Sequence, residues 1–304
     1  MLKARVCEWI ARHNTQATAF VVKHRGHTVA TGATGKRAPE NTSPSVQLDS
    51  VFRMSSVSKV VTASAAMALV EDGRLSLTRA VCDYLPEFSG SKETLVHNLL
   101  THTSGLDTRD YEKLLGEVSC PTVQHTPRSR LQQMVAAACA THPRFDPGQW
   151  CLYGGINYVL LGEIIERCAG CDLNVFAKKR LFDPLDMSDS RYGIDDRLAL
   201  RYVSLDPSIF RDVRPTYDPN DDFELRIPHP SGNLFSTAPD MSAFAQMFLN
   251  KGKHRQSDVL SPATVAAMTR NQIPGVFSKG PTPVLKNGSW GLGWIIQGDS
   301  QWKQ

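Results

Sequence analysis

One apolar segment near residue 60 has the periodicity of a buried helix. Starting at Val57 and ending at Leu69, small and apolar residues recur 3, 4, 7, 8, 11 and 12 positions along, which is the repeat of one helix face. Met67 and Val70 widen this stripe, so the pattern predicts a helix that is buried on most sides. Gly73 is a suitable C-terminal stop, because glycine adopts the left-handed conformation without steric cost.

The rest of the chain alternates turn signals with shorter periodic segments. Two apolar runs at residues 19–22 and 28–30 flank Arg25-Gly26, which predicts a β-hairpin. Further segments are interpreted as helices and, last, as one glycine-interrupted strand, at residues 95–100, 130–140, 157–168, 241–249 and 290–296.

The length and composition fit one folded domain. The 304 residues include 41% hydrophobic and 21% charged residues, which is ordinary for a globular protein large enough to bury a core. Strands near both ends with helices between them predict a single α+β domain over residues 1–304. Its sheet part is expected at roughly 1–50 and 288–304, and its helical part at roughly 55–287.

Charge and cysteine content argue against several other classes. The net charge of +4 is dispersed, and its densest cluster, Lys178-Lys179-Arg180, is typical of a solvated helix face, so we expect no nucleic-acid partner. No apolar run approaches the ~18 residues of a membrane span. Residues 1–14 lack the apolar core of a signal peptide, and an odd count of 7 cysteines favours a reducing compartment, so we expect a cytoplasmic protein. Cys168-Ala169-Gly170-Cys171 has no second ligand pair and is interpreted as a helix end, not a metal site.

Candidate chemistry begins with Ser56-Val57-Ser58-Lys59, at the start of the first apolar helix. A serine and a lysine three residues apart lie on one helix face, so the amine can accept the proton of a serine hydroxyl that attacks a carbonyl. Burial one turn into the helix would lower the pKa of Lys59 toward neutrality, as a general base requires. On this segment alone, Ser56 as a helix cap with a solvated Lys59 stays an open alternative. The same spacing in Ser89-Gly90-Ser91-Lys92 falls in a loop without helical continuation.

Tyr153 is a second candidate proton carrier. It follows a Pro-Gly turn and precedes Gly154-Gly155 and an amphipathic helix, so its hydroxyl can project into a cleft. Beside a lysine ammonium we expect its pKa of ~10 to fall, which would make the phenolate a usable proton shuttle. A packed aromatic side chain is the alternative for Tyr153 taken alone.

Five segments together resemble the serine β-lactamase-like family, which includes class C β-lactamases, penicillin-binding DD-peptidases and esterase relatives. They occur in the family's order and cover nearly the whole chain, at residues 52–59, 99–106, 153–162, 232–240 and 290–294. The resemblance implies an antiparallel sheet flanked by helices, with an all-helical region inserted and the active site between the two. It also implies that Ser56 is the nucleophile, Lys59 its proton acceptor and Tyr153 the second acid/base.

The implied activity is a serine hydrolase that forms an acyl-enzyme with a small-molecule ester or amide and that needs no metal or organic cofactor. β-Lactams and D-peptides are among the substrates that the resemblance implies. Two departures modify this expectation. The family's Tyr-x-Asn has Gly155 at its third position, which points toward esters or small amides. The family's Lys/His-x-Gly strand is not found up to Gln304, so the sheet is expected to be incomplete. The alternatives are an acyltransferase with the same nucleophile and a non-catalytic binding protein.

Overall fold

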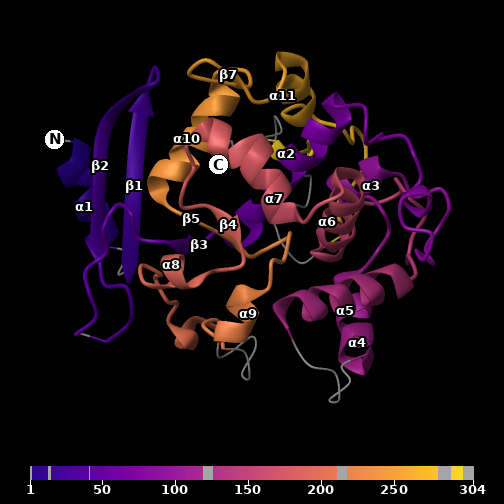
Figure 1. The fold of residues 1–304 in the computed structure, drawn as a ribbon, viewed down its shortest axis with the longest axis horizontal. Helices are drawn as coiled ribbons and strands as arrows, with labels where there is room; N and C mark the ends of the chain where they lie inside the picture. Colours follow the sequence, from indigo (N-terminus) through magenta and orange to yellow (C-terminus); the bar gives the residue numbers. More distant parts are fainter. Residues whose placement is uncertain are drawn as a thin grey trace.

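The computed structural model describes residues 2–12, 15–40, 42–118, 126–210, 218–279 and 289–296 (Figure 1). The helices are α1 (Leu2–Arg12), α2 (Ser58–Glu71), α3 (Val96–Leu100), α4 (Thr108–Val118), α5 (Pro127–Ala140), α6 (Ile156–Ala169), α7 (Leu173–Ala177), α8 (Asp196–Ala199), α9 (Asp222–Arg226), α10 (Ala238–Leu249) and α11 (Pro262–Met268). The strands are β1 (Ala17–His24), β2 (His27–Gly35), β3 (Phe52–Arg53), β4 (Arg191–Tyr192), β5 (Leu234–Ser236), β6 (Lys253–His254), β7 (Ser257–Asp258), β8 (Ser289–Trp290) and β9 (Ile295–Ile296).

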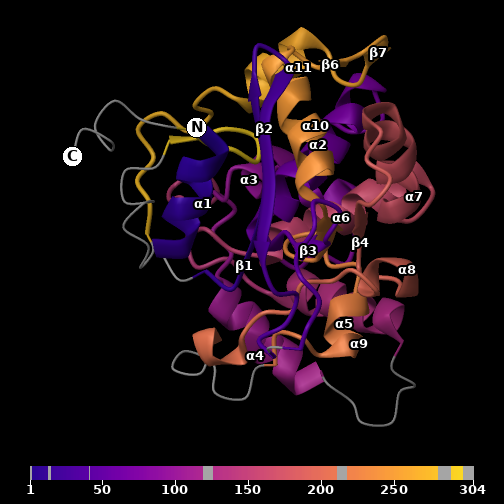
Figure 2. The same cartoon turned by 90° about the vertical axis from the view of Figure 1, so that its left-hand side faces the viewer.

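The predicted N-terminal hairpin is confirmed. Strands β1 and β2 pair antiparallel, and the turn between them uses left-handed backbone at Arg25 (φ 52°) and Gly26 (φ 82°). In Figure 1 this hairpin forms the left edge of the molecule, and α10 packs against β1 on its inner side. Figure 2 shows α1 beside the same hairpin, where it contacts β2.

The predicted apolar helix is α2, and it lies in the centre of the main core. Most of its residues are buried, and it packs against α6, whose Leu160, Leu161 and Ile164 are also buried. A helix that is apolar around most of its circumference is stable only inside a protein, which is where α2 lies. The predicted stop is confirmed, since α2 ends at Glu71 and Gly73 has a φ of 69°.

A small sheet carries the chain into the start of α2. Strands β3 and β4 both pair antiparallel with β5, which lies between them. Because β3 ends at Arg53, this sheet fixes where the following turn begins. The α+β class with antiparallel strands and flanking helices is thus confirmed, whereas the division of the chain into sheet and helical parts stays a prediction.

The last described segment, residues 289–296, differs from the sequence-based expectation. The single strand expected at residues 290–296 is wrong: β8 and β9 are two short strands that pair with each other, with Trp290 opposite Ile295. Gly293, with a φ of 87°, reverses the chain between them. Among the described helices, none has the length and apolar character needed to cross a membrane.

Candidate active site

Ser56 and Lys59 lie side by side where α2 begins. Lys59 Nζ donates a hydrogen bond to Ser56 Oγ at 3.1 Å. Ser56 belongs to a 3-10 turn, Ser55–Val57, and the α-helix starts only at Ser58, so the expectation that α2 itself begins at Ser56 is corrected. The tighter turn arises because the Val57 N–H bonds to the Met54 carbonyl, three residues back, at 3.0 Å.

Strand β5 holds this turn in place. The Leu234 N–H donates to Ser58 Oγ at 3.0 Å, and the Met54 N–H donates to the Leu234 carbonyl at 2.8 Å. Ser58 Oγ in turn donates to the Ser55 carbonyl. Ser55 has a φ of 45°, a left-handed conformation that costs free energy in a non-glycine residue and persists only when neighbours fix it. These contacts therefore fix the backbone immediately before Ser56.

Lys59 is a buried amine without a carboxylate partner. Its side chain is only 5% exposed, and besides Ser56 it donates a hydrogen bond of 2.8 Å to the Ser231 carbonyl. Within the ranges that the structure describes, Lys59 makes no ion pair. Burial lowers the pKa of Lys59 from 10.5 to about 8, because removal from water disfavours the ammonium form. The predicted lowering of this pKa is confirmed in direction.

Tyr153 joins the same group of side chains. It lines the same cavity as Ser56, and Lys59 Nζ lies 5.0 Å from the centre of its ring. Burial raises the pKa of Tyr153, and the influence of the Ser56 side chain only partly opposes this. The expected fall of this pKa is therefore wrong: the amine faces the ring of Tyr153, and burial favours the neutral phenol.

These three side chains open onto one cavity of about 340 Å³. Its wall also contains ionisable residues from distant parts of the chain, namely Arg53, Glu112, Glu224 and His229. A cavity of this size accommodates a small molecule next to Ser56. The three residues singled out from the sequence are thus brought together at one concave surface.

Sequence reasoning missed one wall of this cavity, the loop that precedes β5. Asn233 shapes the loop by donating to the carbonyls of Glu224 (2.7 Å) and Ile227 (3.0 Å). Thr62 of α2 donates to the Pro230 carbonyl at 2.7 Å, so the loop is tied to the same helix as Lys59. His229, which stands between two prolines in the sequence, also lines the cavity. The only signal was its position just before the Gly232-Asn233-Leu234 segment.

Other residues of the recognised segments connect the cavity to the core. The Leu100 carbonyl accepts hydrogen bonds from the Tyr158 hydroxyl (3.2 Å) and from Trp290 Nε1 (3.2 Å). Buried His102 accepts at Nδ1 from the Gly154 N–H at 3.3 Å, which fixes the loop that carries Tyr153. Through these contacts, the recognised segments hold the backbone around the cavity in place, in addition to supplying the three residues that face it.

Metal binding finds no support in the described part of the chain. No group of three or more His, Cys, Asp or Glu side chains there is arranged to hold an ion. Cys168 and Cys171 are both free thiols that are partly buried near the end of α6.

Comparison with known proteins places the chain in a family. The family model described as Beta-lactamase matches residues 2–303, and the chain therefore belongs to this family. It is 28% identical over 291 residues to penicillin-binding protein 4 of Amycolatopsis lactamdurans, covering 93% of this chain and 72% of the relative. It is 30% identical over 207 residues to lovastatin esterase of Penicillium rubens, covering 60% of this chain and 51% of the relative, so the match spans about half of that protein.

The fold comparison agrees. The solved structure of EstCE1, described as a hydrolase with promiscuous acyltransferase activity, matches with a TM-score of 0.76 and 19% identity over 98% of this chain and 84% of that one. At this identity the likeness defines the fold alone. The recognition of the family and of its α+β fold from the sequence is confirmed.

Proposed function

We propose that this protein is a serine hydrolase that acts through an acyl-enzyme on a small-molecule ester or amide. One observation carries the proposal: Ser56 Oγ accepts a hydrogen bond from the buried amine of Lys59, and both residues line one cavity together with the phenol of Tyr153. A nucleophile held between a proton acceptor and a proton donor is the arrangement that acyl transfer requires. Family membership and the printed names of the two relatives support the same class.

The pKa directions support a division of roles between the two proton carriers. Because burial brings the pKa of Lys59 to about 8, part of the amine is neutral near physiological pH and can accept the Ser56 proton. Ser56 Oγ then bonds to the substrate's carbonyl carbon. As the bond between the carbonyl carbon and the leaving group breaks, Tyr153, whose raised pKa keeps it protonated, donates its proton to the departing alcohol or amine. The Lys59 ammonium then returns a proton to Tyr153. Water next adds to the acyl-serine ester, and release of the acid restores the Ser56 hydroxyl.

The direct test is covalent labelling of Ser56. Intact mass after treatment with a fluorophosphonate should show one adduct, and p-nitrophenyl acetate should be hydrolysed. Ser56→Ala should remove both the adduct and at least ~10³-fold of the rate. Ser89→Ala, in the other Ser-x-x-Lys segment, is the matched control and should retain both, because Ser89 Oγ only donates to the Cys139 carbonyl at 2.7 Å.

Two other results would change the assignment. No adduct and no turnover in the unmodified protein would favour the non-catalytic binding protein. Transfer of the acetyl group to an added alcohol, in preference to water, would identify an acyltransferase that uses the same nucleophile. A cytoplasmic location stays a prediction.

A further inference from the structure

Ser231 presents a second hydroxyl to the catalytic cavity. The residue is 6% exposed and lines the cavity with Ser56, and its main-chain carbonyl accepts the 2.8 Å hydrogen bond from Lys59. Because Lys59 Nζ also bonds to Ser56 Oγ at 3.1 Å, a single amine separates Ser231 from the nucleophile. Any substrate carbonyl that Ser56 attacks therefore lies close to Ser231.

The neighbouring histidine sets the direction of the Ser231 hydroxyl. His229 Nδ1 lies 3.2 Å from the Ser231 N–H and 3.1 Å from Ser231 Oγ. A main-chain N–H can only donate, so Nδ1 is the acceptor and carries no proton. Burial and the charges of Lys59 and Arg53 lower the pKa of His229 to about 4, which keeps the imidazole neutral. The Ser231 hydroxyl consequently donates to Nδ1 and leaves its oxygen lone pairs as acceptors.

Gly155 leaves the space that this hydroxyl needs. A Cβ atom on Gly155 would lie 3.1 Å from Ser231 Oγ, which is closer than ordinary van der Waals contact. Its distance to Ser231 Cβ would be 3.9 Å, an ordinary contact, so the conflict is with the hydroxyl. The backbone of Gly155 (φ −67°) is otherwise compatible with any residue. A side chain at position 155 would therefore displace the Ser231 hydroxyl from its present position.

We propose that Ser231 is a specificity-determining residue, whose oxygen accepts a hydrogen bond from a hydroxyl or amino group next to the reacting carbonyl of the substrate. This inference rests on the proposed function and narrows its substrates to acyl compounds that carry such a donor. No other described polar atom lies within hydrogen-bond distance of Ser231 Oγ besides His229 Nδ1, so the oxygen is available to a ligand.

The test compares p-nitrophenyl lactate with p-nitrophenyl propionate, which differ by one hydroxyl next to the carbonyl. Each kcat/KM is divided by the hydroxide-catalysed rate of the same ester. The unmodified protein should favour lactate, and Ser231→Ala should lower the ratio of kcat/KM for lactate to kcat/KM for propionate about three- to tenfold, the range of one neutral hydrogen bond. Ser208→Ala, at an exposed serine outside the cavity, is the matched control and should change neither value.

Gly155→Ala supplies a second, independent measurement. Its Cβ displaces Ser231 Oγ, so it should also lower the lactate preference, and it should have no further effect on that preference in Ser231→Ala. Equal losses for both esters in Ser231→Ala, or no loss for either, would overturn the inference while fluorophosphonate labelling of Ser56 still upheld the proposed function. Absence of turnover together with absence of labelling in the unmodified protein would overturn both.

Discussion

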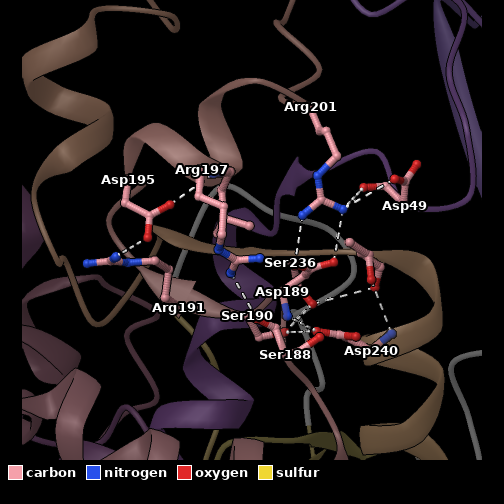
Figure 3. A network of polar contacts seen from close by, with 12 residues as sticks. Asp49, Ser188, Asp189, Ser190, Arg191, Asp195, Arg197, Arg201, Ser236 and Asp240 are labelled. Carbon is pink, nitrogen blue, oxygen red and sulfur yellow. Dashed lines mark hydrogen bonds and ion pairs between the residues drawn. The ribbon is translucent and has the colours of Figure 1, made fainter.

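Buried or partly buried charged side chains occur at two sites in this molecule, and only one of the two environments stabilises the ionised form. In the network of Figure 3, Asp189 accepts two hydrogen bonds from Arg201, at 2.9 and 2.7 Å, and a third contact from Arg197. Hydrogen bonding to Arg201 lowers the pKa of Asp189 in spite of its partial burial. Lys59, in the cavity beside Ser56, makes no such ion pair among the described residues, and burial lowers its pKa to about 8.

The difference separates a structural from a chemical use of charge. A paired carboxylate is held in its ionised form, so it links chain segments and does not exchange protons near neutral pH. An unpaired buried amine is destabilised in its ionised form, which makes it a base. The Asp189 network accordingly ties the β4 region to Asp49, whose carbonyl accepts from Arg201 at 2.9 Å. The hydrogen bonds of Lys59 within the described ranges go instead to two neutral oxygens.

The largest effect is expected from Lys59→Met, which keeps an unbranched apolar chain, one heavy atom shorter, and removes the amine. Loss of the proton acceptor should lower kcat/KM for p-nitrophenyl acetate by ~10²–10⁴-fold. The free energy of unfolding at pH 7 should not fall and should rise by roughly 1–2 kcal/mol, because a desolvated ammonium is replaced by an apolar group. Chemical denaturation and steady-state kinetics on the same sample measure both.

The difference in free energy of unfolding between the unmodified protein and Lys59→Met should depend on pH. The pKa of Lys59 falls from 10.5 to about 8 on folding, so between these values the unfolded chain binds more protons and stability rises with pH. Lys59→Met should abolish this rise. A variant that is both inactive and less stable across the whole pH range would contradict the view of Lys59 as a strained base.

The second prediction concerns the rate profile of the unmodified protein. If neutral Lys59 is the base, kcat/KM should increase about tenfold per pH unit well below its pKa and level off above about 8. Stopped-flow acylation with p-nitrophenyl acetate between pH 5.5 and 9.5 measures this profile. A midpoint near 10 would indicate that the amine is solvated in solution, and a flat profile would exclude Lys59 as the base.

The third prediction concerns the network around Asp189, where the substitution removes a charge that is paired. Asp189→Asn removes the charge that holds Arg197 and Arg201 and should lower the free energy of unfolding by about 1–3 kcal/mol at pH 7. Because the folded pKa of Asp189 is lowered, its contribution is present above the unfolded pKa and is lost as pH falls through the folded value, so the deficit should shrink near pH 3. The kcat/KM should remain within about twofold at 25 °C. Asp83→Asn, at an exposed pair with Arg79, is the matched control and should change stability by less than ~0.5 kcal/mol.

The sequence predicted the part of this comparison that is local. Ser56 and Lys59 are three residues apart, and the apolar repeat through Leu69 implied burial, so the pairing and the lowered lysine pKa followed from one segment. The resemblance of five segments to the family then predicted that Tyr153 lies at the same site as Ser56. Residue spacing alone does not predict this. What failed was the direction of the Tyr153 pKa, because burial of the phenol raises it and the local sequence does not reveal that burial.

Non-local contacts could not be obtained from the sequence. Ser231 lies 172 residues from Lys59 in the chain, and its carbonyl reaches Nζ only because Asn233 and Pro230 fold the preceding loop onto α2. The partners of Asp189 are nearer in the chain, since Arg197 and Arg201 lie 8 and 12 residues further on, in α8 and just after it. Short apolar segments such as residues 290–296 were ambiguous for another reason, since one left-handed glycine converts a strand into a hairpin.

The smallest expected effect comes from Asp240→Asn, beside the paired network but without a cation. Asp240 Oδ2 accepts from Ser190 Oγ at 2.8 Å and from the Asp189 N–H at 2.9 Å, and burial raises its pKa. An amide oxygen can accept both hydrogen bonds, so the substitution should cost less than ~1 kcal/mol, mainly the favourable position of a carboxylate in the first turn of α10. Since a raised folded pKa makes stability fall as pH rises from about 4, Asp240→Asn should flatten that fall, as thermal unfolding at several pH values would measure. A cost as large as that of Asp189→Asn would instead show that an ionised Asp240 contributes to the network, and the contrast between paired and unpaired charges would not hold within it.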